Sequence, residues 1–135
     1  NGVEIDLIVR GFCCLKPNVK GSSSKIRVRS VVGRFLEHSR IFYFGSGKTN
    51  PAEGCFLIGS ADWMNRNLSK RVETIVPVSR KEHREYLWNY FQLLLEDKKL
   101  SWILKSNGDY EKPEFHTDAN KSGCQEKMMD VRSLS

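Results

Sequence analysis

Six short stretches of the chain carry the pattern of apolar and polar positions that β-strands show. Some alternate between apolar and polar side chains, as strands with one buried face do, and others are continuous apolar runs. These stretches are residues 3–9, 26–32, 40–44, 55–58, 72–78 and 100–104. Pro77 places the fifth stretch at a sheet edge or at the end of a strand. The pattern predicts a protein in which strands outnumber helices.

One stretch has helical spacing. Ser79 and Glu82 stand three residues apart and form a capping box, the signature of a helix start. Apolar side chains then recur every three or four positions, at Tyr86, Leu87, Tyr90, Phe91, Leu94 and Leu95. Such a stripe faces the protein core, and Lys98 and Lys99 suit the negative end of the helix dipole. We therefore expect one long helix between these signals.

The remaining segments set the domain organisation. Residues 16–24 and 45–54 are rich in glycine, serine, asparagine and proline, which is typical of loops. From residue 113 the chain is polar and weakly patterned, so residues 113–135 are predicted to be a mobile tail with one turn around residues 125–129. Residues 1–112 form the predicted domain, of the α/β class, with a mixed sheet and packed helices. Because the apolar pattern begins at Val3, we expect the chain to be part of a longer protein.

Composition and charge narrow the function. The 135 residues include 39% apolar and 28% charged side chains, which is typical of a globular chain. No apolar run approaches the ~20 residues of a membrane span. Residues 1–106 carry 18 basic and 10 acidic side chains, whereas residues 107–135 carry 4 and 6. The positive charge of the predicted domain favours an anionic partner such as phosphate, nucleotide, nucleic acid or an acidic membrane surface; a basic surface kept for solubility is the simpler alternative.

Cysteines and histidines do not indicate a metal site. The cysteines at positions 13, 14, 55 and 124 lack the C-x-x-C spacing of zinc and redox sites. Free thiols favour a reducing, cytoplasmic location, with association with a membrane surface as the alternative. The three histidines are too dispersed for a zinc site. We assign His83 to the surface of the helix and no role to His116.

Polar side chains cluster next to the predicted strands, where loops of α/β sheets bind ligands. Arg10 follows the first strand, His38 precedes the third, and Arg40 stands at the start of the third. An imidazole beside a guanidinium suits a phosphoryl group, although a histidine bound to Glu37 or to backbone would have the same sequence.

A second polar cluster follows the fourth strand. Gly59 lets a ligand approach the backbone, and Ser60 can donate its hydroxyl to a phosphate oxygen. Asp62 can accept a hydrogen bond from the ring of His38, and Arg66 can line an anion groove. A turn with a helix-capping serine or aspartate is the alternative.

Three motifs, taken together, resemble a known family. They are residues 9–15 (VRGFCCL), 26–40 (IRVRSVVGRFLEHSR) and 60–68 (SADWMNRNL). In this order and spacing they resemble the C-terminal domain of the polyphosphate kinases that synthesise long chains. The resemblance covers roughly residues 2–106 and matches the tail more loosely.

The resemblance implies a fold and a reaction. The family's two C-terminal domains are similar to the phospholipase D fold, and this chain would be most of the second. The resemblance implies transfer of the terminal phosphate of ATP to polyphosphate, reversibly and with Mg²⁺. It implies that His38 is catalytic, that Arg10 and His38 contact the phosphates, and that Arg40, Ser60, Asp62 and Arg66 support them.

The resemblance also implies what other domains would supply. The family's phosphorylated histidine and its Mg²⁺ site lie in domains that precede this one, so no metal ligand is expected in this chain. We therefore expect the chain to be inactive alone, and the full-length protein to form a homo-oligomer.

Two other functions remain open. A non-enzymatic module that binds polyanions or nucleic acid would use the same basic side chains. Nucleic acid is not expected as a partner, because aromatic side chains are not interleaved with the basic ones as stacking would require. A phosphodiesterase of the phospholipase D type is disfavoured, because only one His-x-Lys-like motif is present and arginine replaces its lysine.

Overall fold

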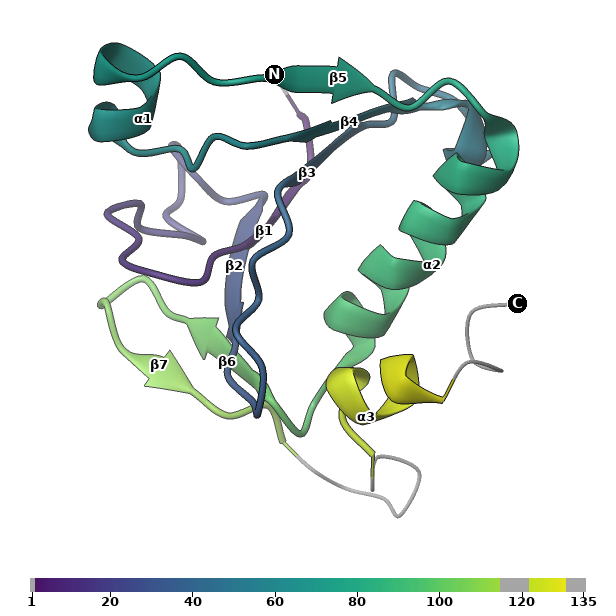
Figure 1. Cartoon of the computed structure of the whole chain (residues 1–135). Coiled ribbons are helices and arrows are strands. Elements are labelled where there is room, and N and C mark those ends of the chain that lie inside the picture. Colours follow the sequence, from purple (N-terminus) through teal and green to yellow (C-terminus); the bar gives the residue numbers. More distant parts are fainter. Residues whose placement is uncertain (1, 115–121, 131–135) are drawn as a thin grey trace. The chain divides into compact units, whose positions relative to one another are not determined.

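The strands belong to two separate compact units. The computed structural model describes residues 2–114 and 122–130. Unit 1 comprises the chain up to Glu37 and again from Gln92 onward, and unit 2 comprises residues 38–91. Figure 1 shows the elements of both along the chain. His116 lies outside the described residues.

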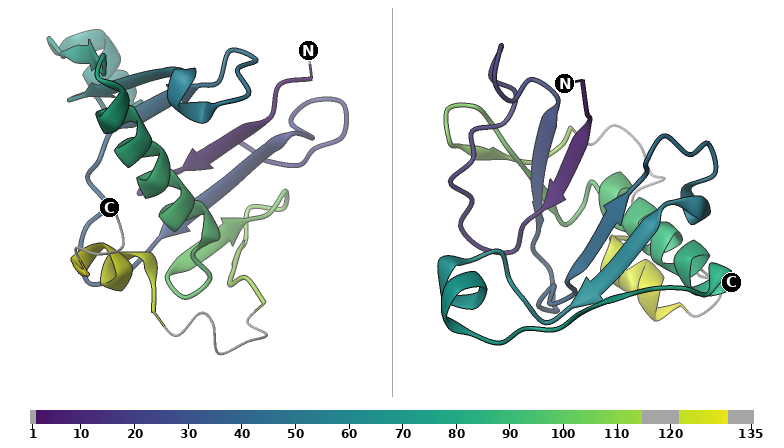
Figure 2. Two further views of the ribbon diagram at one scale, coloured as in Figure 1. Left: turned by 90° about the vertical axis from the view of Figure 1, so that its right-hand side faces the viewer. Right: turned by 90° about the horizontal axis from the view of Figure 1, so that it is seen from above.

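Unit 1 contains a sheet of four strands in the order β1-β2-β6-β7. The strands are β1 (Ile5–Ile8), β2 (Ile26–Val31), β6 (Ser101–Leu104) and β7 (Tyr110–Glu111). β1 and β2 are parallel, with Ile5 opposite Ile26, and the other pairs are antiparallel. Figure 2 shows β1 and β2 side by side. The sheet is therefore mixed.

The two arginines of β2 have different environments, although they point to the same face. Arg27 is half exposed and donates from Nε to Asp6 at 2.6 Å and from Nη2 to Glu4 at 3.2 Å. Arg29 is half-buried and donates to the backbone carbonyls of Leu94 and Leu95. A guanidinium at these last carbonyls satisfies acceptors that a helix end leaves without intrahelical partners. Arg29 therefore joins β2 to the end of the long helix.

Asp97 joins three elements of unit 1. It follows helix α2 (Lys81–Glu96) and is 5% exposed. One carboxylate oxygen accepts from the N–H groups of Leu100 and Ser101, and the other accepts from Cys124. Cys124 begins helix α3 (Cys124–Met129). The carboxylate thus links the end of α2, the start of β6 and the start of α3.

Unit 2 contains an antiparallel sheet in the order β3-β4-β5. Its elements are β3 (Ile41–Phe44), a 3-10 turn η1 (Pro51–Glu53), β4 (Cys55–Gly59), helix α1 (Asn65–Lys70) and β5 (Ile75–Pro77). α2 belongs to unit 2 as far as Phe91. Phe56 is 1% exposed, and Tyr43 contacts its ring at 4.7 Å and that of Trp88 at 5.0 Å between centroids. These aromatic contacts form the core of unit 2 against α2.

The predicted fold class is confirmed. All six predicted strands and the long helix are present, with strand ends shifted by at most three residues. The strands form two sheets rather than one. The helix begins at Lys81, which puts Arg80 rather than Ser79 at the position before its first turn. Within the described part of the chain, no helix is both long and apolar enough to cross a membrane.

The turn expected around residues 125–129 is helix α3. Cys124 is 1% and Gln125 4% exposed, so this helix is packed into unit 1. The division of the chain at residues 112 and 113 stays a prediction.

Candidate functional site

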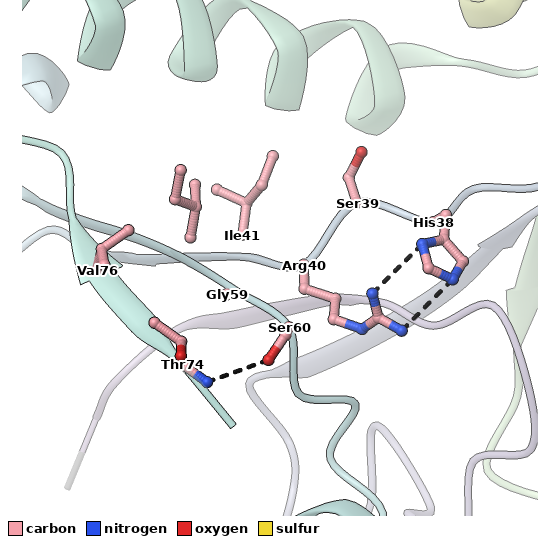
Figure 3. Close-up of a pocket in the computed structure, with 9 residues that line it drawn as sticks. His38, Ser39, Arg40, Ile41, Gly59, Ser60, Thr74 and Val76 are labelled. Carbon is pink, nitrogen blue, oxygen red and sulfur yellow. Dashed lines mark hydrogen bonds between the residues drawn. The ribbon is translucent and has the colours of Figure 1, made fainter. Parts of the chain in front are cut away.

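An open pocket of about 510 Å³ lies in unit 2. Residues 38–41 at the start of β3, residues 58–60 at the end of β4, and Thr74 and Val76 at β5 line it. Figure 3 shows His38 and Arg40 pointing toward each other from the segment before β3. The antiparallel pairing of β3 with β4 brings Arg40 and Gly59 together, because the N–H of Gly59 donates to the carbonyl of Arg40 at 3.0 Å. The pocket therefore unites the two polar clusters of unit 2.

Asp62 fixes the guanidinium of Arg40. Nε of Arg40 donates to Oδ1 of Asp62 at 2.8 Å, and Nη2 donates to Oδ2 at 3.2 Å. The two side chains are 18% and 26% exposed. Hydrogen bonding to Asp62 holds the pKa of Arg40 above its usual value. This two-point geometry orients a guanidinium as well as neutralising it.

Both terminal nitrogens of Arg40, including the Nη2 that also donates to Asp62, face the imidazole of His38. Nη1 lies 3.3 Å from Nδ1 and Nη2 lies 3.4 Å from Nε2. A guanidinium only donates, and a neutral imidazole has one accepting nitrogen, so at most one contact is a hydrogen bond. The other ring nitrogen then carries an N–H that can donate to a ligand. His38 is exposed, so a ligand can reach its ring.

Ser60 is engaged with protein groups. Its hydroxyl donates to Oε2 of Glu73 and accepts from the N–H of Thr74 at 3.1 Å. Glu73 also accepts from the amide of Asn67 at 2.9 Å. Hydrogen bonds from Ser60 and Asn67 hold the pKa of Glu73 below its usual range. The hydroxyl hydrogen that was expected to bind phosphate is therefore donated to Glu73, and phosphate binding by Ser60 stays a prediction.

The structure explains why position 59 is a glycine, which the sequence did not indicate. A Cβ at this position would lie 2.9 Å from the carbonyl oxygen of Thr74 and 2.9 Å from Cγ1 of Ile75. The Cβ side of Gly59 is thus filled by β5 and the residue before it, and the approach of a ligand to the backbone of Gly59 at the pocket stays a prediction. Glycine therefore permits the close pairing of β4 with β5.

The other predicted residues lie elsewhere on the two units. Arg10 is exposed in unit 1, just after β1, where the preceding Val9 donates to the carbonyl of Arg29 at 2.8 Å. Arg66 is exposed on α1 of unit 2. The structure brings together His38, Arg40, Ser60 and Asp62 within unit 2. Both carboxylate oxygens of Asp62 accept hydrogen bonds from Arg40. The hydrogen bond expected from His38 to Asp62 stays a prediction.

Sequence reasoning missed Glu73 and Asn67. Glu73 reaches Ser60 because the β4–β5 pairing sets Gly59 opposite Ile75, and Asn67 joins the cluster by donating to Glu73. The available signal was a carboxylate inside the otherwise apolar predicted strand 72–78, but strand pairing was needed to interpret it.

The residues described here do not fit a Mg²⁺ site. Within residues 2–114 and 122–130, no group of three or more His, Cys, Asp and Glu side chains is placed to hold a metal ion. Asp62 and Glu73, the carboxylates that contact the pocket residues Arg40 and Ser60, accept from Arg40, Ser60 and Asn67. We derive no step of the reaction through a metal in this chain.

Comparisons with known proteins identify the family. Residues 1–125 match the family described as polyphosphate kinase C-terminal domain 2. A polyphosphate kinase of Synechocystis sp. is 52% identical over 109 residues, which cover 81% of this chain and 14% of that protein. The polyphosphate kinase of Pseudomonas aeruginosa is 41% identical over 129 residues, covering 96% of this chain and 18% of that protein.

A solved structure agrees with these matches. The crystal structure of polyphosphate kinase from Porphyromonas gingivalis superposes with a TM-score of 0.85 and 35% identity, covering 98% of this chain and 20% of that one. The chain thus spans less than a fifth of these curated relatives' length. It belongs to the polyphosphate kinase family, as a C-terminal domain of the phospholipase D-like type.

Proposed function

We propose that this chain supplies phosphate-contacting residues to a polyphosphate kinase, which transfers the terminal phosphate of ATP reversibly to polyphosphate. One observation carries the proposal. An exposed His38 stands at an open pocket, with its ring against a guanidinium that Asp62 fixes at two points. Family membership supports ATP and polyphosphate as the substrates.

Phosphoryl transfer depends more on alignment and charge neutralisation than on covalent chemistry by the protein. In the proposed reaction, the free ring N–H of His38 donates to an oxygen of the phosphoryl group as it transfers. Arg10 binds phosphate oxygens with its guanidinium, which suits two-point contact with an oxyanion. Arg40 orients the imidazole of His38, and Asp62 contributes by fixing the guanidinium of Arg40. Mg²⁺ would be held by other domains of the full-length protein.

The proposal assigns the phosphorylated histidine to the preceding domain, as the family resemblance implies. We expect this chain alone to bind ATP or polyphosphate weakly and to turn over neither. Incubation of the chain with ATP labelled at its terminal phosphate tests this assignment. Absence of protein-bound label is the expected result, and stable label on this chain would overturn the assignment.

A module that only binds polyanions is the second candidate, and the positive charge of residues 1–106 favours it. Competition separates the two. If the site is built for phosphate chains, a short polyphosphate displaces a fluorescent ATP analogue at far lower phosphate concentration than single-stranded DNA. Equal competition per phosphate by DNA would favour the binding module.

A further inference from the structure

The backbone just before His38 is held by one buried side chain. Residues 33–37 connect β2 to His38 and lie outside the strands and helices. Oε1 of Gln125 accepts from the N–H of Phe35 at 3.0 Å, and its Nε2 donates to the carbonyl of Phe35 at 2.8 Å. Nε2 also donates to Glu37 at 2.7 Å. The amide of Gln125 thus binds both backbone groups of one connector residue and the side chain of another.

Gln125 is itself held in place. It is 4% exposed and lies on α3, whose first N–H, from Cys124, donates to Asp97. Glu126 accepts from the N–H of Gly123 at 2.9 Å and from Lys99 at 2.8 Å. Contacts at both sides of Gln125 therefore anchor α3 in unit 1, and an anchored amide can hold a loop more firmly than a mobile one.

At Gly33 the connector packs closely against Gln125 and Leu100. A Cβ at Gly33 would overlap the side-chain amide of Gln125 and would lie 2.9 Å from Cδ1 of Leu100. Gly33 therefore allows the connector to pass close beside Gln125. Phe35 and Leu36 remain 47% and 70% exposed, so burial of their own side chains does not hold this segment.

We propose that Gln125 is a positioning residue for His38. The inference rests on the proposed role of His38 in phosphoryl transfer. Glu37, which Gln125 binds, is joined to His38 by a peptide bond. Fixing residues 35 and 37 restricts the backbone from which the imidazole extends. A displacement of about 1 Å at a catalytic group can cost ~10²-fold in rate, so a residue that fixes this backbone affects catalysis without touching substrate.

The test uses the full-length enzyme that contains this chain. Gln125→Met keeps the length and most of the volume of the side chain and removes its three hydrogen bonds. We expect kcat for polyphosphate synthesis to fall about tenfold, with KM for ATP nearly unchanged. Gln92→Met, the same change at a half-buried position of α2, is the matched control and should keep kcat.

A local measurement accompanies the kinetics. Amide hydrogen exchange should become at least about fivefold faster at Phe35 in Gln125→Met, while strand β6 keeps its protection. Faster exchange across the whole of unit 1 would mean that Gln125 only stabilises the fold, and would overturn the proposal. So would an unchanged kcat in a variant with a faster-exchanging Phe35.

A paired exchange provides a rescue. Gln125→Glu places a carboxylate oxygen against Glu37 and the carbonyl of Phe35 and should lower kcat. Adding Glu37→Gln restores a donor and an acceptor between the two side chains but not the donor to Phe35, so kcat should recover in part. Recovery of kcat in the double variant supports positioning, and no recovery contradicts it. His38→Ala measured in parallel separates the two proposals: if it keeps full synthesis, the proposed function fails, whereas loss in His38→Ala with none in Gln125→Met refutes only the positioning role.

Discussion

Arg40 donates two hydrogen bonds to Asp62, at 2.8 and 3.2 Å, and presents the rest of its guanidinium to His38. The lysine of phospholipase D-like His-x-Lys motifs has one ammonium group and cannot make this pair of parallel bonds. Arginine at this position, with aspartate at position 62, therefore gives the site a fixed plane beside the imidazole. The Arg40–Asp62 pair therefore orients His38 and does not only supply charge to the site.

Arg40→Lys in the full-length enzyme should lower kcat for synthesis about tenfold or more while the charge is kept, because lysine loses the two-point contact. Steady-state kinetics with ATP measure the effect. Arg27→Lys is the matched control, because Arg27 also makes two parallel bonds, to Asp6 at 2.6 and 2.8 Å, but belongs to unit 1 and does not line the pocket of unit 2. Equal losses in both variants would count against a role for orientation at His38.

Asp97 should make the stability of the chain depend on pH. Burial by itself raises the pKa of Asp97, but the N–H groups of Cys124, Leu100 and Ser101 outweigh it and hold the pKa below its usual value. A depressed pKa contributes stability above the unfolded-state pKa, which is about 3.9. That contribution should disappear as the pH falls from about 4 through the lower folded-state pKa.

Asp97→Asn tests the same carboxylate by urea unfolding. The substitution replaces a charged acceptor by a neutral amide, whose NH₂ group faces one of the three N–H groups. It should lower the free energy of unfolding by about 1–3 kcal/mol at pH 7. The difference in the free energy of unfolding between Asp97→Asn and the native chain should be smaller at pH 3. A difference that is independent of pH would show that the carboxylate charge contributes nothing.

Cys124 should resist alkylation in the folded chain. Burial, and then its contact with Asp97, raises the pKa of this thiol to about 12, and the residue is 1% exposed. Thiolate is the reactive form, so iodoacetamide at pH 8 should modify exposed Cys14 and Cys55 at least ~100-fold faster than Cys124. Peptide mass spectrometry measures the three rates. Labelling of Cys124 at a rate like that of Cys55 would mean that α3 is not packed as described.

The sequence predicted the strands and the long helix better than it predicted which strands pair with each other. Strands and the long helix follow from local patterns of apolar residues, which explains their agreement with the structure. Helix α1 and strand β7 were missed, because Asn65–Lys70 has no apolar stripe and Tyr110–Glu111 is only two residues long. The separation into two sheets was missed as well, since strand pairing depends on contacts between distant segments.

The candidate site shows the same division. His38, Arg40, Ser60 and Asp62 were recognised from motifs, and the structure brings them together in unit 2. The donors and acceptors within the cluster were not predictable, because Ser60 meets Glu73 only through the pairing of β4 with β5. Gln125 was placed in a polar tail, although its amide is buried against residues 90 positions earlier.

The most direct test of the whole account is the rate of polyphosphate synthesis by His38→Ala in the full-length enzyme, compared with His83→Ala. His83 is exposed on α2 and has no assigned role. Loss of one transition-state donor costs ~10²–10³-fold in rate, so the account predicts at least that loss for His38→Ala. It predicts near-normal synthesis for His83→Ala and unchanged unfolding transitions for both. Near-normal synthesis by a folded His38→Ala enzyme would contradict the account.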